Sequence, residues 1–289
     1  MDMAITFKNV GFTYQAGTPF ATPALYDVNF NIPDHSFTAV IGHTGSGKST
    51  MVQLLDGLEL PTDGEITIGS ATITAATKRK TLNGMRHDIG MVFQFPEAQL
   101  FEQTVLADVM FGPMNYGMSK AEAEIAAKAA LALVQMPESS YEASPFDLSG
   151  GQMRRVAIAG VIAMEPEILI LDEPTAGLDP AGQADLMALF ANLQKERDLT
   201  VILITHQMEF VGQYADNVLV FDAGSVVKTG TPAEIFADSD WLRQKQLDVP
   251  AATQFSDYLE AKGLPLHGAL DLDQLADEIV GLIGGPTHE

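Results

Sequence analysis

Short apolar runs recur along the first 230 residues and are separated by polar turns, a pattern that predicts β-strands. Ile5–Tyr14 is rich in β-branched and aromatic residues, and residues 28–32 alternate apolar with polar positions, as a half-buried strand does. Three further runs are almost wholly apolar, which is typical of parallel strands covered on both faces; they are Phe37–Ile41, residues 168–171 and residues 201–204. These runs predict an α/β fold.

Turn-forming residues mark the connections between the runs. Gly17-Thr-Pro-Phe-Ala-Thr-Pro23 has the composition of a loop between two strands. Asp63-Gly64 and Ala223-Gly224 are dipeptides that favour tight turns. The elements expected around these turns are strands at residues 65–73 and 88–95, a hairpin over residues 217–227 and a helix at residues 49–55.

The pattern becomes mostly helical between about residues 97 and 165. Ser119-Lys-Ala-Glu122 forms a capping box, and the alanine-rich run behind it predicts a helix that reaches Val134. Beyond Gly230 the strand pattern stops, and the expected elements are a capped short helix from Thr231 and amphipathic helices at residues 251–262 and 272–283. We therefore predict an α/β unit over residues 1–230, with the helical insert, and a small helical appendage over residues 231–289.

Composition narrows the class of protein. A chain of 289 residues that is 46% hydrophobic fits one large domain, or one domain with a small appendage. No apolar run approaches the length of a membrane span, and the first seven residues predict a strand and not a signal peptide. The absence of cysteine excludes disulfides and thiolate metal sites, which suits a reducing cytosol.

The chain is strongly acidic. Its formal net charge is −22, from 38 acidic and 16 basic residues. Such a surface repels phosphate backbones and anionic headgroups, so the charge argues against a nucleic-acid partner and against direct electrostatic docking on a bilayer. The alternative is that the charge only aids solubility.

Residues 42–49 match the phosphate-loop pattern G-x-x-x-x-G-K-[ST]. The glycines let backbone N–H groups turn toward phosphate oxygens, the lysine reaches the β- and γ-phosphates, and the hydroxyl that follows it binds Mg²⁺. A strand-like run precedes the motif and a helix-like run follows it, as the chemistry requires. The candidate nucleotide-binding residues are Gly42, His43, Thr44, Gly45, Ser46, Gly47, Lys48, Ser49 and Thr50, of which His43 and Thr44 fill free positions.

A second acidic motif ends one of the buried strands. Asp172 follows the apolar run at residues 168–171 and can lie near the magnesium ion. Glu173 then lies beside the γ-phosphate, where a base or water-orienting group is needed. The alternative, a strand that ends in two solvated acids, is favoured for this motif alone but not beside a phosphate loop.

Together these motifs resemble those of the nucleotide-binding subunit of an ATP-binding-cassette (ABC) transporter. The resemblance covers about residues 3–230, and the motifs occur once each in the expected order: the phosphate loop, Gln94, Leu148-Ser-Gly-Gly-Gln152, Asp172-Glu173, Gly177-Leu178-Asp179 and His206. It implies the P-loop NTPase fold of this family, with a RecA-like core, N-terminal antiparallel strands and a helical signature subdomain.

The resemblance also implies roles for individual residues, with ATP and Mg²⁺ as ligands. Catalysis falls to Glu173, His206 and Gln94, of which Glu173 polarises the attacking water. Ser49 and Gln94 bind the metal, and Asp172 lies next to its ligands. Tyr14 stacks on adenine, although a core or edge tyrosine is a close alternative. The signature residues Leu148, Ser149, Gly150, Gly151 and Gln152 contact ATP held by a partner subunit, and Asp179 links the two sites.

Residues 95–101, 108–115 and 154–160 are similar to the energy-coupling factor ATPases, which power bacterial uptake of vitamins and transition metals. The insertion at residues 17–23 resembles the second of the two ATPase subunits in that group. The resemblance implies a heterodimer with a related ATPase, paired partly by the C-terminal appendage, and a peripheral location on the cytoplasmic face of the membrane. The other implied partners are a transmembrane scaffold, docked at residues 95–117, and a small substrate-binding membrane subunit.

Three alternatives remain open at this point. The first is an ATPase of another importer class, which would share the same nucleotide chemistry. The second is a soluble ABC ATPase that acts on DNA or ribosomes, which the acidic charge disfavours. The third is a nucleotide-binding module that does not hydrolyse ATP, which the presence of Glu173 and His206 disfavours.

Overall fold

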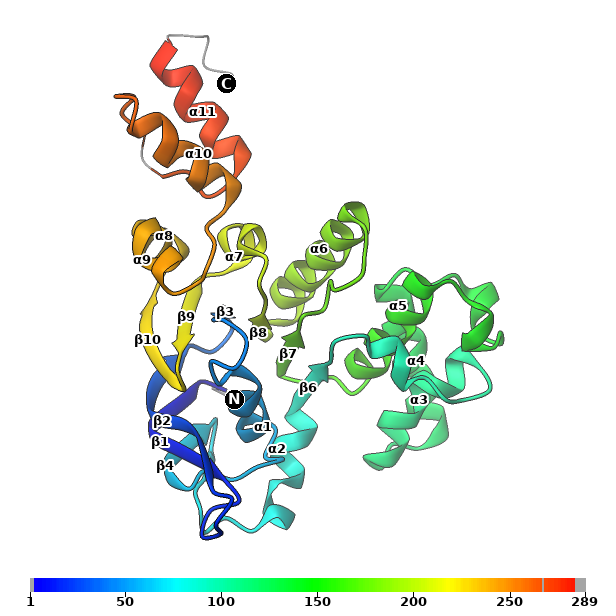
Figure 1. The fold of residues 1–289 in the computed structure, drawn as a ribbon. Coiled ribbons are helices and arrows are strands. Elements are labelled where there is room, and N and C mark those ends of the chain that lie inside the picture. The colour runs from blue at the N-terminus through cyan, green and yellow to red at the C-terminus, as the bar shows by residue number, and fades with distance from the viewer. Residues whose placement is uncertain (1–2, 267, 284–289) are drawn as a thin grey trace.

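The computed structural model describes residues 3–266 and 268–283, and within them two β-sheets form the centre of the protein (Figure 1). The larger sheet has the strand order β10-β9-β3-β8-β7-β6 and is parallel except for the β9–β10 hairpin. Its strands are β3 (Phe37–Ile41), β6 (Ile89–Val92), β7 (Ile168–Asp172), β8 (Thr200–Ile204), β9 (Asn217–Asp222) and β10 (Ser225–Gly230). Every residue of β3 and β8 is buried, as their apolar sequences predict.

The smaller sheet is antiparallel and has the order β2-β1-β4-β5. Its strands are β1 (Ile5–Tyr14), β2 (Thr22–Ile32), β4 (Asp63–Ile68) and β5 (Ala71–Ile73). The single strand expected at residues 65–73 is wrong in detail, because the chain reverses at Gly69, whose φ of 54° is left-handed. Apolar residues of this sheet share one core with α1 (Lys48–Leu55) and with β7 and β8, so the sheet covers the helix that follows the phosphate loop.

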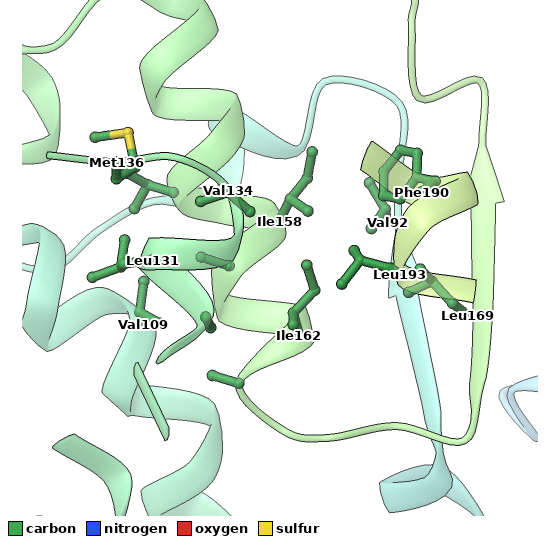
Figure 2. Close-up of a cluster of buried hydrophobic side chains, with 14 of the residues drawn as sticks. Val92, Val109, Leu131, Val134, Met136, Ile158, Ile162, Leu169, Phe190 and Leu193 are labelled. Carbon is green, nitrogen blue, oxygen red and sulfur yellow. The ribbon is translucent and has the colours of Figure 1, made fainter. Parts of the chain in front are cut away.

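A helical layer lies beside the β6 and β7 edge of the larger sheet (Figure 1). It consists of α3 (Val105–Asn115), α4 (Lys120–Leu133) and α5 (Gly150–Ile162). The predicted capping box starts α4, with the Glu122 N–H donating to Ser119 and the Ser119 N–H donating to Glu122. Figure 2 shows Ile158 and Ile162 of α5 between this layer and the sheet, and burying each contributes about 2 kcal/mol.

The remaining helices of the α/β unit follow strands of the larger sheet or precede them. They are α2 (Asn83–Asp88), α6 (Pro180–Arg197) and α7 (Met208–Tyr214). Phe190 and Leu193 of α6 pack into the same core as Val92 and Leu169 (Figure 2). Helix α6 therefore packs against β6 and β7 of the larger sheet.

The C-terminal helices fall into two groups. The first, α8 (Pro232–Phe236) and α9 (Ser239–Gln244), shares a core with β3 and β9 through residues such as Phe236 and Leu242. The second, α10 (Ala251–Glu260) and α11 (Leu272–Ile283), has a small core of its own and lies at one end of the molecule (Figure 1). No helix among the described residues is long and apolar enough to cross a membrane.

Candidate nucleotide-binding site

The phosphate loop connects β3 to α1 and leaves backbone donors open. Gly45 and Gly47 have φ angles of 82° and 110°, in the region that favours glycine, and a Cβ on Gly47 would lie 2.8 Å from Leu25 Cδ2. Gly47 is also the N-cap of α1 and supplies no side-chain acceptor. The first N–H groups of α1 and the positive end of the helix dipole are therefore available to an anion.

Lys48 places a cation inside this loop. Its side chain is buried, and its Nζ donates to the carbonyl oxygens of Gly42 at 2.5 Å and His43 at 3.1 Å. Burial lowers the pKa of Lys48, while the charges of Glu173 and Asp172 act to raise it. The lysine and the two carboxylates thus act on one another electrostatically across one site.

Neighbouring parallel strands bring the acidic residues and the histidine to the phosphate loop. β3, β8 and β7 are adjacent, and their carboxyl ends lead to the phosphate loop, to His206 and to Asp172-Glu173 respectively. Between them lies a cleft of about 680 Å³. The predicted residues that line it are Tyr14, Thr44, Gly45, Gly47, Lys48, Ser49, Thr50, Gln94, Asp172, Glu173 and His206.

Glu173 has the environment of a general base. Burial, and then the charge of Asp172, raises the pKa of Glu173 to about 7, although Lys48 acts in the opposite direction. Its Oε1 is buried and has no hydrogen-bond partner among the described residues; His206 Nε2 lies 3.5 Å away, too far for a good hydrogen bond. The backbone φ of Glu173 is 47°, a left-handed conformation that is uncommon for a non-glycine residue. The Glu173 carboxylate, which lines the cleft and has a raised pKa, can accept a proton from water.

His206 faces the same site from the end of β8. Burial and the charge of Lys48 lower the pKa of His206, although the Asp172 charge raises it. The ring is therefore neutral at neutral pH, and one of its nitrogens can donate a hydrogen bond to a phosphate oxygen. Half of the His206 side chain is exposed to solvent, so a ligand can reach it.

The signature peptide does not line this cleft. Ser149 is the N-cap of α5 and forms a capping box with Gln152, while Leu148 packs against the helical core. A Cβ added to Gly150 or Gly151 would meet no atom within 4 Å in the described part of the chain. Nothing within these residues therefore requires glycine at either position, although each costs about 1 kcal/mol in a helix relative to alanine.

Other predicted residues lie beside the cleft or outside it. The Tyr14 ring lines the cleft, and its hydroxyl lies 3.0 Å from Thr50 Oγ1 and donates to Gln53 at 2.8 Å. Asp179 accepts the Gly182 N–H at 2.9 Å and caps α6. Gly42 and Ser46 are buried residues of the phosphate loop and do not line the cleft. The His43 ring points to Asp222, with Nε2 3.1 Å from Oδ1.

Sequence reasoning missed several residues that line or support the site. The cleft is also lined by Thr22, Pro23, Ala24, Tyr26, Ile204, Ala223 and Gly224. Thr22, Pro23, Ala24 and Tyr26 lie at the start of β2, Ile204 ends β8, and Ala223 and Gly224 form the β9–β10 turn. The sequence predicts turns next to both β2 and β10, but no local signal places either segment beside the phosphate loop.

Arg154 is a further residue to which sequence reasoning gave no role. Only 3% of its surface is exposed, and its guanidinium binds the Glu97 carboxylate through two bonds of 3.0 and 2.9 Å. It also donates to the carbonyl oxygens of Pro174 at 3.3 Å and Ala176 at 2.8 Å. Burial acts to raise the pKa of Glu97, but the bonds and charge of Arg154 help to hold it below its ordinary value. Arg154 therefore ties α5 to the segment after Gln94 and to the segment after Glu173.

A phosphate loop at one strand end, an acidic pair at the next but one and a separate signature helix define an ATPase of the ATP-binding-cassette class. The ABC transporter family matches residues 25–176, which is more than half of the chain. The chain belongs to this family and, within it, to the ATP-binding proteins of energy-coupling factor transporters.

The relatives that support this assignment match over nearly their whole length. The energy-coupling factor transporter ATP-binding protein EcfA2 of Lactiplantibacillus plantarum is 58% identical over 279 residues, 96% of this chain and 95% of the relative. The protein of the same name from Ligilactobacillus salivarius is 52% identical over 289 residues, 99% of this chain and 100% of the relative.

Solved structures confirm the fold. The cbiO1 protein of Clostridium perfringens, part of the ABC transporter complex cbiONQ, has a TM-score of 0.74 at 38% identity, over 84% of this chain and 94% of its own. A dimeric post-hydrolysis state of the ATP-binding cassette MJ0796 with ADP and Pi has a TM-score of 0.69 at 33% identity, over 79% of this chain and 98% of its own.

Proposed function

We propose that this energy-coupling factor ATPase binds ATP with Mg²⁺ in the cleft and hydrolyses it only when a second cassette closes over the nucleotide. Phosphates fit the open N–H groups of the loop and the buried Lys48 ammonium. Adenine fits against the Tyr14 ring at the end of β1.

The ends of Ser49, Gln94 and Asp172 fit a magnesium ion. The Ser49 hydroxyl and the Gln94 amide are exposed and line the cleft, and Asp172 lies beside them. No group of three or more histidine, aspartate or glutamate side chains that could hold a metal is found among the described residues. The two neutral oxygens would therefore hold the ion together with nucleotide phosphates, as is usual for Mg²⁺, and the ion would neutralise charge on those phosphates.

Within this arrangement Glu173 accepts a proton from the attacking water and His206 donates to the γ-phosphate. The Glu173 carboxylate lines the cleft and can receive the water there, and the lowered pKa of His206 keeps the ring from adding a full charge beside Lys48. The signature residues would complete the site from the second cassette. Asp179, exposed at the start of α6, would then lie at the contact surface between the two cassettes.

The observation that carries the proposal is that the signature glycines are solvent-exposed and outside the cleft of their own chain. A test is the rate of ATP hydrolysis per subunit as the purified protein, with its related subunit if one copurifies, is diluted. We expect that rate to fall on dilution, because the active form is a dimer. A rate per subunit that stays constant in a strictly monomeric sample would contradict the proposal.

Family membership also supports a proposal for the partners. We propose that the protein works with a related ATPase subunit, a transmembrane scaffold and a small substrate-binding membrane subunit. The complex would place this ATPase at the cytoplasmic face of the membrane and would transport vitamins or transition metal ions. Of the C-terminal helices, α10 and α11 would contact the partner ATPase, since α8 and α9 are packed into the main core. Phe255, Tyr258 and Leu272 are exposed on these two helices.

The docking surface for the scaffold is the groove between α3 and α4. Its volume is about 550 Å³, and Phe111 and Met114 are among its lining residues. Phe101 and Phe111 are exposed and meet edge to face at 4.8 Å between ring centroids, which leaves an apolar patch beside the groove. Leu100, the residue before Phe101 in the predicted docking segment, is 7% exposed and belongs to the core, so its side chain is not available for docking.

Phe111→Asp is expected to prevent copurification with the membrane subunit and to leave nucleotide affinity unchanged. A carboxylate in place of the Phe111 ring would remove the exposed apolar contact with Phe101 and would have to be desolvated on docking, whereas the cleft is lined by other residues. The matched control is Ile125→Asp on α4, since Ile125 is 72% exposed and does not line the groove. Normal copurification of the Phe111 variant, or equal loss with the Ile125 variant, would contradict this surface.

A further inference from the structure

Three side chains connect the phosphate loop to the segment after α9. Lys245, the residue that ends α9, donates to Asp222 Oδ2 at 2.6 Å. The other oxygen of the same carboxylate lies 3.1 Å from Nε2 of His43, which is the second residue of the phosphate loop. Nδ1 of that ring lies 2.8 Å from the carbonyl oxygen of Thr44 in the loop itself. The route from the C-terminal segment to the loop is thus continuous.

The atoms along this route fit one another chemically. Both nitrogens of His43 face acceptors, so a protonated ring donates at both ends, while a neutral ring satisfies only one of them. The hydrogen bond from Lys245, with a smaller contribution from His43, holds the pKa of Asp222 below its ordinary value. The Asp222 side chain is 20% exposed, and those of Lys245 and His43 are each 34% exposed, so the contacts are partly shielded from water.

Backbone contacts bring the same turn against the same loop. The Gly224 N–H donates to the Ser46 carbonyl at 2.9 Å, and a Cβ on Gly42 would lie 2.5 Å from the Phe221 carbonyl oxygen. The backbone of the loop is therefore in close contact with the end of β9 and with the turn that follows it. Asp222, at that end, is the point where Lys245 acts.

We propose that Lys245 is a positioning residue for the phosphate loop: by fixing Asp222 it orients His43, and with it the loop that receives the nucleotide phosphates. The segment after α9 and the nucleotide site are then one coupled unit, although Lys245 does not line the cleft. This inference rests on nucleotide binding at the loop, and it adds a residue outside every motif of the cassette.

The test compares full-length variants by titration with ADP and Mg²⁺, a probe that is not consumed. Lys245→Met is expected to weaken the affinity about tenfold, because a charge-assisted bond that orders the loop is lost. Lys245→Arg, which can still donate to Asp222, should restore most of the affinity. Lys245→Met together with His43→Gln should weaken binding no more than the stronger single change, since both act on one route.

A matched control separates positioning from general loosening of α9. Lys228 on β10 also contacts α9, through its ammonium 5.1 Å from the Trp241 ring centroid, and it does not belong to the chain of side-chain bonds that links Lys245 to the phosphate loop among the described residues. Lys228→Met is expected to bind ADP as the unaltered chain does, with melting temperatures measured for all variants. Equal affinity for Lys245→Met and the unaltered chain, an equal loss with Lys228→Met, or multiplied losses in the double variant would each overturn the inference. Failure of the unaltered chain to bind ADP would instead refute the proposed function.

Discussion

Glu173→Gln is expected to reduce ATP hydrolysis by about a thousandfold while ATP remains bound. Glutamine keeps the shape of the side chain but cannot accept a proton from water. The buried Oε1 that has no partner in the described structure would then face the γ-phosphate without acting as a base. The measurements are phosphate release and retention of ATP on the paired cassettes. Hydrolysis within a few-fold of the unaltered rate would refute the assignment.

The pH dependence gives the same prediction a second signature. The pKa of Glu173 is about 7 without nucleotide, so half of the base is protonated near pH 7 and becomes active as the pH rises. Because kcat/KM reports the free enzyme, kcat/KM for ATP should increase through about pH 7. The pKa of His206 is lowered from its ordinary value, so the histidine loses its proton at a lower pH than Glu173 does. The residual activity of Glu173→Gln should lack this rise.

The substitution should also stabilise the nucleotide-free protein. The pKa of Glu173 is raised from 4.5 to about 7, so the folded state binds more protons than the unfolded state between these values. The contribution of this group is therefore fully favourable below about pH 4.5 and is lost as the pH rises through about 7. Glu173→Gln removes that penalty, so its melting temperature should exceed that of the unaltered chain at pH 8 and match it near pH 4.5. A lower melting temperature at pH 8 would contradict the stated cause of the shift.

Gly151→Asp is expected to abolish hydrolysis, by at least about a hundredfold, without weakening ATP binding to its own chain. The added Cβ meets no atom within 4 Å among the described residues, and an aspartate in the first turn of α5 is favourable to the helix dipole, so the fold should be retained. Across the dimer seam the new carboxylate would face the γ-phosphate, a like charge at close range.

The control for this variant is Gly160→Asp on the same helix. Gly160 also has open space around its Cβ position, but it lies near the other end of α5. We expect it to hydrolyse ATP at close to the unaltered rate. Phosphate release by each variant, beside ADP affinity measured on the separate chain, distinguishes the two. Normal hydrolysis by Gly151→Asp would mean that the signature does not complete the site of a second cassette.

The strands and the phosphate loop could be predicted because their signals are local. The apolar run of β3, the glycines of the loop and the start of α1 follow one another in the chain, and the bounds of β1 and β3 agree with the expectation. Asp172 could be placed near the phosphates because it ends a buried strand, whereas the role of His206 was implied by the resemblance to ABC transporters. Order along the chain therefore carried most of the candidate site.

The residues that were missed depend on contacts between distant segments. Arg154 reaches Glu97 57 positions away, and nothing near either residue indicates the pair. Tyr26 and Gly224 meet only because β2 and β10 lie close in the folded chain; the Tyr26 N–H donates to Gly224 at 2.8 Å. Leu100 lies within the predicted docking segment at residues 95–117, but it is buried in a core formed with residues of α3 to α5. Such contacts are properties of the tertiary structure and leave no periodic signal.

The boundary between α9 and α10 matters for the design of truncated proteins. Sequence composition divides the chain after Gly230, yet α8 and α9 seal one side of the central sheet, with Ile235, Phe236 and Leu242 almost inaccessible to water. A chain truncated after residue 230 would expose this apolar face of the sheet to water and would be prone to aggregate. A truncated protein that keeps only the ATPase unit should instead end close to Pro250, where the last helix pair begins.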